Sequence, residues 1–144
     1  MGNVEKEKVR ILAVQMESII GELQLNIDSV KNLLIANLEK YPSDFIFLPE
    51  VWTVGWCPKV FKQCAEDVES SKSLDMLTQI AKKYNVNIIG GSIIRKHCGK
   101  LYNSSPVINR NGELITFYDK NHLFSYYGDN EGDYITRGES PVMV

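Results

Sequence analysis

The sequence predicts an α/β fold in which helices pack on a sheet that mixes parallel and antiparallel strands. Short apolar segments alternate with segments whose apolar residues recur at helical spacing, which is the order typical of this class. A strong hairpin signal in the second half of the chain adds antiparallel pairing. With 144 residues, 44% of them hydrophobic, the chain has apolar material for one domain or part of one, and too little length for two.

The first part of the chain is expected to hold two strands with one helix between them. Residues 9–16, "VRILAVQM", are rich in branched apolar residues and predict a buried strand. Apolar residues recur at helical spacing over residues 30–38, and Asn26 or Asp28 is a candidate cap for this helix. Residues 45–49, "FIFLP", form an apolar segment too short for a helix, so they predict the second strand.

A second helix and a third strand are expected next. The helix begins at Ser70 or Ser71, because Leu74 and Leu77 start an apolar face that continues at helical spacing. Residues 86–94, "VNIIGGSII", predict the strand. The two glycines inside this strand indicate either a bulge or a place where another backbone segment approaches closely.

The last part of the chain predicts a β-hairpin. Residues 100–120 form its two strands, and Asn111-Gly112 is a two-residue turn signal. Residues 141–144, "PVMV", look like the opening of a further strand, which is either a short edge or the start of a longer domain's continuation. The domain is therefore assigned to residues 9–144, preceded by a polar extension over residues 1–8.

Composition and charge exclude several classes of function. The chain has 16 Lys+Arg and 18 Asp+Glu, a formal net charge of -2, and neither sign forms a block, so nucleic acid and anionic membranes are not expected partners. No apolar run approaches bilayer-spanning length, and the polar amino terminus does not resemble a signal peptide. The 3 cysteines lack Cys-x-x-Cys spacing, which argues against disulfides and a metal site and favours the cytoplasm.

Two charged residues follow predicted strands directly. Glu50 comes after "FIFLP", and Lys120 comes after "ELITFYD". In layered α/β folds, residues just beyond the carboxyl ends of strands converge on ligand sites, so an acid and a lysine placed there can meet across a pocket. Spacing alone also fits the plain alternative, in which both are solvated turn residues without contact.

Several motifs together resemble the nitrilase superfamily, the carbon-nitrogen hydrolases, from Val9 onward. The matching stretches are "RILAVQM", "FIFLPEVWTVGW", "IIGGSI", "LYNSSPVINRNGELITFYDKNHLF" and "EGDYITRG". The resemblance implies a four-layer αββα sandwich, of which this chain is the amino-terminal part. The "PEVWTVGW" loop is similar to the omega-amidase-type branches rather than to classical nitrilases.

The resemblance also implies a glutamate, lysine and cysteine triad that acts through a thioester and needs no cofactor. Glu50 matches the general base, Lys120 the lysine that stabilises the tetrahedral intermediate, and Glu131 a second glutamate that orders the site. The family's nucleophile lies on the strand after the segment that "GESPVMV" resembles, so it is expected beyond Val144.

The cysteines within the chain do not match that nucleophile. Cys57, Cys64 and Cys98 lie outside the family's cysteine motif, and a packing role is expected for Cys57, because the carboxylate of nearby Glu50 raises the pKa of a thiol.

Aromatic residues of the same loops are candidate substrate contacts. In the family, the loop after the base lines the acyl-side pocket, which makes Trp52, Trp56 and Phe124 candidates by resemblance. The plain alternative is that these side chains pack in the core or at its rim.

The expected function is hydrolysis of small amides or nitriles by a homodimer, as the resemblance implies. The alternative is a catalytically inactive, truncated subunit that binds a ligand or a partner. A nucleotide-binding module is disfavoured, because no phosphate-loop pattern accompanies Gly90 and Gly91.

Overall fold

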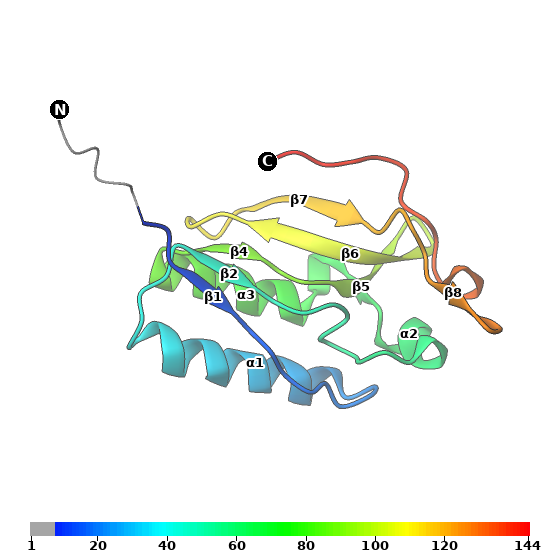
Figure 1. Ribbon diagram of the computed structural model, residues 1–144, viewed down its shortest axis with the longest axis horizontal. Coiled ribbons are helices and arrows are strands. Elements are labelled where there is room, and N and C mark those ends of the chain that lie inside the picture. The colour runs from blue at the N-terminus through cyan, green and yellow to red at the C-terminus, as the bar shows by residue number, and fades with distance from the viewer. Residues whose placement is uncertain (1–7) are drawn as a thin grey trace.

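The computed structural model describes residues 8–144, so the predicted polar extension lies outside the described residues except for Lys8. Figure 1 shows the helices and strands in order along the chain. The helices are α1 (Leu23–Leu38), α2 (Pro58–Cys64), α3 (Lys72–Tyr84) and two short 3-10 helices, η1 (Val68–Ser70) and η2 (Glu131–Asp133). The strands are β1 (Ile11–Ala13), β2 (Phe45–Phe47), β3 (Glu66–Asp67), β4 (Asn87–Ile89), β5 (Ile93–His97), β6 (Lys100–Ile108), β7 (Leu114–Asp119), β8 (Ser125–Tyr126) and β9 (Asp129–Asn130).

The main sheet mixes parallel and antiparallel strands, which confirms the predicted fold class. β1, β2 and β4 are parallel neighbours, and β3 is parallel to β5. β6 is antiparallel to β4, β5 and β7. Ser104 of β6 pairs with both β5 and β7, so β7 lies along one edge of β6 while β4 and β5 follow each other along the other.

The hydrophobic core lies between the sheet and one layer of helices. α1 and α3 cover one face of the sheet (Figure 1), and their buried residues pack against Ile46, Ile88 and Ile108 of the strands. Side chains alternate along a strand, so Phe47, which is 39% exposed, points to the opposite face. The described residues therefore form one helical layer and one sheet layer, and the other two layers of the four-layer sandwich stay a prediction.

The predicted cap of α1 is wrong. The helix begins at Leu23, so Asn26 lies inside its first turn and is only 1% exposed. The Asn26 amide group donates to the backbone oxygens of Ile19 and Thr53, and its Oδ1 accepts from the Ile19 N–H. This side chain ties two loops to the helix instead of capping it, which the local sequence does not reveal.

The predicted start of α3 at Ser70 or Ser71 is confirmed, and Ser71 caps the helix. Ser71 precedes the helix, and its hydroxyl accepts a hydrogen bond from the Leu74 N–H at 3.1 Å.

Two predicted strand segments differ in the structure. The expected strand over residues 86–94 is interrupted by its glycines and forms β4 and β5. Residues 141–144 form no strand, and among residues 8–144 no backbone hydrogen bond holds them to the sheet. The hairpin is confirmed, although its connection spans residues 109–113 and is closed by the Asn109 N–H donating to the Glu113 carbonyl at 3.0 Å.

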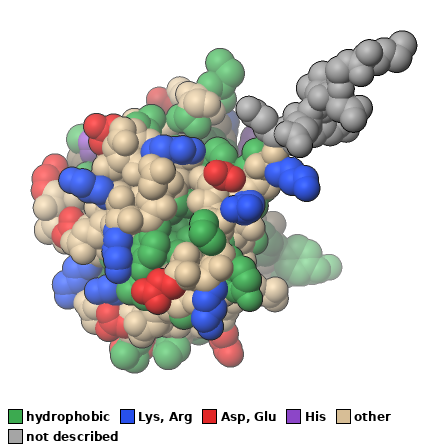
Figure 2. All heavy atoms as spheres, turned by 90° about the vertical axis from the view of Figure 1, so that its left-hand side faces the viewer, with side chains coloured by type: hydrophobic (Ala, Val, Ile, Leu, Met, Phe, Trp, Pro, Cys, Tyr) green, Lys and Arg blue, Asp and Glu red, His purple; other side chains and the backbone are tan. Residues whose placement is uncertain are grey.

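Charges of both signs share one face of the molecule. Figure 2 shows Lys and Arg side chains interspersed with Asp and Glu on the face that it presents. Among the described helices, none is long and apolar enough to cross a membrane.

Candidate active site

The break between β4 and β5 holds the backbone around Glu50. The Ser92 N–H donates to the Pro49 carbonyl at 3.1 Å, and the Val51 N–H donates to the Ser92 hydroxyl at 2.9 Å. A Cβ atom at Gly91 would overlap the Pro49 carbonyl oxygen, and Gly91 has a φ of +58°, so only glycine fits there. The close backbone approach predicted for these glycines is therefore confirmed, and it fixes Glu50 from both sides.

The residue after Glu50 has a strained backbone. Val51 has a φ of +49°, a left-handed conformation that is rare for a β-branched side chain. Val51 is 1% exposed, and its carbonyl accepts from the Gly55 N–H at 2.8 Å, so the surrounding contacts hold the conformation in place. Strain of this kind gathers at functional sites, which supports a functional hypothesis for this loop.

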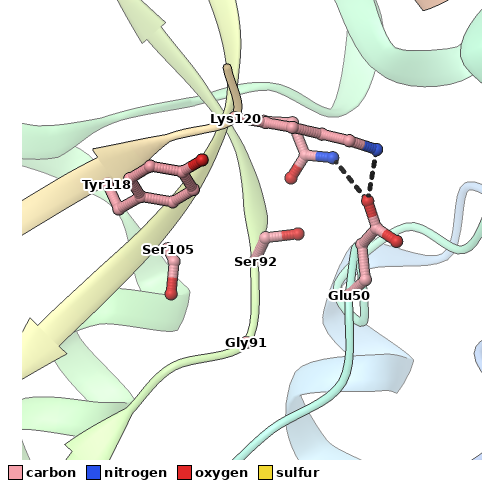
Figure 3. Close-up of a pocket in the computed structure, with 7 residues that line it drawn as sticks. Glu50, Gly91, Ser92, Ser105, Tyr118 and Lys120 are labelled. Atoms are coloured by element: carbon pink, nitrogen blue, oxygen red, sulfur yellow. Dashed lines mark hydrogen bonds and ion pairs between the residues drawn. The ribbon is translucent and has the colours of Figure 1, made fainter. Parts of the chain in front are cut away.

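Lys120 lies just beyond β7 and contacts Glu50. Its Nζ is 2.8 Å from Glu50 Oε1 and 3.0 Å from Glu131 Oε2 (Figure 3 draws the first contact). The Lys120 N–H donates to the Asn103 carbonyl at 2.9 Å, and the Lys120 carbonyl accepts from the Gly138 N–H at 2.9 Å. The structure thus brings together the three residues predicted to be catalytic, and the alternative of two separate solvated residues is excluded.

Glu131 is buried, and both of its oxygens are hydrogen-bonded. Its side chain is 0% exposed. Oε1 accepts from Asn103 Nδ2 at 3.1 Å, and Oε2 accepts from the Phe124 N–H at 2.8 Å in addition to the contact with Lys120. These partners offset the cost of burying the carboxylate, and neither oxygen is left without a partner.

Only one of the two carboxylate oxygens of Glu50 is hydrogen-bonded among the described residues. Its side chain is 55% exposed. Oε1 accepts from Lys120 Nζ at 2.8 Å and from Asn103 Nδ2 at 3.0 Å, whereas Oε2 has no partner within residues 8–144. Figure 3 shows this second oxygen pointing away from both bonds. Oε2 is therefore the carboxylate oxygen of the site that is free to accept a proton.

The charge of Lys120 is favoured by its neighbours. Burial alone lowers the pKa of Lys120, but hydrogen bonds to Glu50 and Glu131 and the negative charges of both carboxylates outweigh burial and raise that pKa. Lys120 is thus an ammonium group at neutral pH, held in place by two carboxylates. A fixed cation of this kind is suited to stabilise negative charge that develops during a reaction.

A cavity of about 310 Å³ lies beside Glu50 and Lys120. It is on the sheet face opposite α1 and α3, because Asn103 and Ser105 alternate along β6 with residues that face the helices. Its walls are Glu50, Gly91, Ser92, Asn103, Ser105, Tyr118 and Lys120.

The predicted substrate contacts separate into two groups. Trp56 and Phe124 are 42% and 43% exposed, meet edge to face at 5.8 Å, and line a second cavity together with Glu131. Lys120 Nζ lies 5.4 Å from the centre of the Trp56 ring. Trp52 is 0% exposed, and its indole N–H donates to the Gly90 carbonyl at 2.9 Å, so it packs in the core and braces the β4–β5 break.

The three cysteines do not contact Glu50 through any hydrogen bond in the described part of the chain. Burial raises the pKa of the Cys64 thiol, the charge of Glu22 raises it further, and this thiol donates to a backbone carbonyl. Cys57 is partly buried in the wall of the second cavity, and Cys98 is exposed in a turn. Residues 8–144 contain no cluster of three or more His, Cys, Asp or Glu that could hold a metal ion.

Asn103 and Ser92 are site residues that sequence reasoning missed. Asn103 is 3% exposed and its amide reaches both glutamates. The polar run from Asn103 to Ser105 inside the "LYNSSPVI" strand was the available signal, because a buried amide needs hydrogen-bond partners.

Known proteins similar to this chain come from one family. The sequence profile described as carbon-nitrogen hydrolase matches residues 10–143. A Schizosaccharomyces pombe hydrolase is 35% identical over 138 residues, which is 87% of this chain and 43% of that protein. The chloroplastic omega-amidase of Arabidopsis thaliana is 30% identical over 141 residues, covering 87% of this chain and 38% of that protein, and the omega-amidase of Bos taurus is 35% identical over 109 residues, covering 71% and 39%.

Solved structures show the same fold. A Xanthomonas campestris CN-hydrolase superfamily protein matches 96% of this chain and 49% of its own, with a TM-score of 0.84 and 24% identity. A Saccharomyces cerevisiae member of the nitrilase superfamily matches 92% and 49%, with a TM-score of 0.79 and 23% identity. The chain thus spans less than half the length of the relatives named above. Its matched residues, its fold and its similarity to omega-amidases agree, and the chain belongs to the carbon-nitrogen hydrolase family, the nitrilase superfamily.

Proposed function

We propose that this chain supplies the acid–base half of an enzyme that hydrolyses carbon-nitrogen bonds in small amides. The observation that carries the proposal is the contact of one ammonium group, Lys120, with two carboxylates of which only Glu50 keeps a free oxygen. Family membership and the omega-amidase relatives support the reaction class.

The proposed nucleophile is a cysteine thiol that follows Val144. Glu50 Oε2 removes the thiol proton, and the thiolate forms a bond to the carbonyl carbon of the amide. Lys120 stabilises the negative oxygen of the tetrahedral intermediate. Protonated Glu50 then gives its proton to the departing nitrogen, which leaves as ammonia, and a thioester remains.

The second half of the reaction uses the same base. Glu50 takes a proton from water, the resulting hydroxide adds to the thioester carbonyl, and the carboxylic acid leaves as the sulfur regains its proton. Each proton that Glu50 accepts is returned in the same half-reaction, so the enzyme is regenerated without a cofactor. Glu131 holds Lys120 in this scheme, because its oxygens are already bound.

Substrate size is limited by the walls of the site. Trp56 and Phe124 present apolar ring faces near Lys120, which suits a short acyl chain with an apolar part. By resemblance to the family, we also propose a homodimer in the cytoplasm. Among nitriles and amides we favour amides, because two of the relatives cited above are omega-amidases.

A second candidate function is binding without catalysis. It is favoured by the lack of any hydrogen bond between Glu50 and a cysteine within residues 8–144. In that case the cavity beside Lys120 would hold a small ligand or a segment of a partner, and no covalent intermediate would form.

The two candidates differ in ammonia release and in mass. We expect the full-length protein to release ammonia from some members of a panel of small aliphatic amides, and to gain the mass of one acyl group on a cysteine when it is quenched during turnover. A folded protein that gives neither ammonia nor an acyl adduct with any amide of the panel would contradict the hydrolase proposal and favour the binding subunit.

A further inference from the structure

We propose that Asn103 is a positioning residue that holds Glu50 by one carboxylate oxygen, Oε1, and so keeps Oε2 free. The inference rests on the proposed function for its catalytic consequence, but its structural part is independent of any turnover. In the proposed scheme Asn103 contacts neither the thiol nor the substrate amide, so it acts through Glu50.

The geometry gives Asn103 two carboxylate partners and few alternatives. Its Nδ2 lies 3.0 Å from Glu50 Oε1 and 3.1 Å from Glu131 Oε1, so both amide hydrogens are directed at carboxylates. The residue is 3% exposed and lies in the middle of β6, where its carbonyl accepts from the Lys120 N–H. Its side chain is therefore fixed by the sheet, and Glu50 is fixed by that side chain.

The charge balance of the site explains why a neutral donor is needed. Two carboxylates share a single ammonium, with Nζ to oxygen distances of 2.8 Å and 3.0 Å. An amide adds two hydrogen bonds without adding charge, whereas an aspartate at the same place would bring a third negative group. In the described chain, the titratable groups that face Glu50 are Lys120, Glu131 and Tyr118.

Lys120 and Asn103 bind the same oxygen of Glu50, which makes the two oxygens unequal. Oε1 takes both bonds and Oε2 takes none among the described residues. Without the Asn103 amide, Lys120 alone would hold Glu50 Oε1, and the carboxylate could rotate about that single hydrogen bond.

The direct test follows the surroundings of the Glu50 carboxylate without requiring activity. The full-length protein is labelled with ¹³C at glutamate side-chain carboxyls, and the Glu50 signal is assigned by its absence in Glu50→Gln. At neutral pH we expect the Glu50 carboxyl signal to move in Asn103→Leu, because one of the two hydrogen bonds to Oε1 is lost. Asn87→Leu is the matched control, because Asn87 is a partly buried β4 amide bonded to the Asp44 carbonyl, and it should leave the Glu50 signal unchanged.

A second variant protects the test against misfolding. Asn103→Ser has a hydroxyl too short to reach either carboxylate and is used if the leucine variant does not fold. In amide hydrolysis, both variants are expected to lower kcat by about tenfold or more with little change in KM.

The outcomes separate this inference from the proposed function. A Glu50 signal that moves in Asn103→Leu or Asn103→Ser, in a protein that hydrolyses no amide, supports positioning and contradicts the hydrolase. If the wild type is active and either variant keeps both the wild-type Glu50 signal and the wild-type kcat, the positioning role is overturned and the hydrolase stands.

Discussion

Asp119 and Lys120 are neighbours in the sequence, yet they belong to two different charge clusters. Asp119 is in a closed cluster, in which the charges balance, and Lys120 is in an open cluster, in which Glu50 Oε2 has no partner among the described residues. Asp119 pairs with Arg95, whose Nη2 donates to both of its carboxylate oxygens at 2.8 Å and 3.0 Å. Arg95 Nε donates to the Ser104 hydroxyl at 3.0 Å, and that hydroxyl donates to Asp119. The charges of this cluster cancel, and the members bind one another in a ring.

Aromatic rings enclose the Arg95 cluster as well. The guanidinium carbon lies 4.6 Å from the centre of the Phe117 ring and 5.3 Å from that of Tyr102, and the Arg95 side chain is 8% exposed. By contrast, the cluster of Lys120 has two acids for one base, an exposed carboxylate and an adjoining cavity. A neutral cluster whose members are all hydrogen-bonded thus stabilises a sheet, whereas a cluster with excess negative charge and a free carboxylate oxygen is suited to proton transfer.

Breaking the closed pair is expected to have the largest effect on stability. Arg95→Leu leaves Asp119 without its cation in a partly buried place, and we expect the free energy of unfolding to fall by about 3 kcal/mol. Chemical denaturation of the wild type and the variant measures the change. A loss of less than about 1 kcal/mol, the range of exposed pairs, would show that the enclosure by the rings does not matter.

Breaking the open cluster is expected to cost less. Lys120→Met removes the cation from buried Glu131, which keeps its bonds from Asn103 and Phe124, and we expect a loss of about 2 kcal/mol at neutral pH. Chemical denaturation at neutral pH measures the change. A loss of less than about 0.5 kcal/mol would show that the bonds from Asn103 and Phe124 hold Glu131 without the cation. Lys120→Arg keeps the charge and is the control.

The α/β order could be predicted from the sequence pattern. The contact of Glu50 with Lys120 could be predicted because strand ends converge at one edge of a sheet and because the motifs resemble the nitrilase superfamily, whereas spacing alone also fitted two separate solvated residues. The roles of the two tryptophans could not. Trp52 and Trp56 lie four residues apart in one loop, and only the three-dimensional path of the loop buries the first and exposes the second.

The closed cluster was also beyond sequence reasoning. Arg95 and Asp119 are both strand residues, and their contact depends on the register of β5, β6 and β7, which sets Ser104 between them. Asn103 is a similar case, since its partners come from segments far away along the chain. Side-chain contacts that depend on the register of strands far apart in the sequence cannot be predicted from a local sequence pattern.

The raised pKa of Lys120 gives a smaller, pH-dependent difference. A raised pKa means that the folded state holds the proton more tightly than the unfolded state, so the contribution is complete below the unfolded pKa of about 10.4 and is lost as the pH rises through the higher folded value. The difference in unfolding free energy between wild type and Lys120→Met should therefore be constant between about pH 7 and 9 and shrink above about pH 10.5. Shrinkage that begins below pH 9 would contradict the raised pKa.

The exposed pair beside the closed cluster should contribute least. Lys96 Nζ lies 3.4 Å from Asp67 Oδ2, and both side chains are about half exposed. We expect Lys96→Leu to change the free energy of unfolding by less than about 0.5 kcal/mol. Because Lys96 follows Arg95 in β5, a loss as large as that of Arg95→Leu would mean that the strand, and not the buried pair, determines both results.

The most direct test of the contrast between the two clusters is the rate of ammonia release per folded molecule in Glu50→Gln and Asp119→Asn of the full-length protein. We predict that Glu50→Gln lowers the rate by about a thousandfold while unfolding is almost unchanged, because it removes the base and little packing. Asp119→Asn should unfold more easily but keep its rate per folded molecule within about tenfold of wild type. Wild-type turnover in Glu50→Gln, or an equal loss in both variants, would contradict the account.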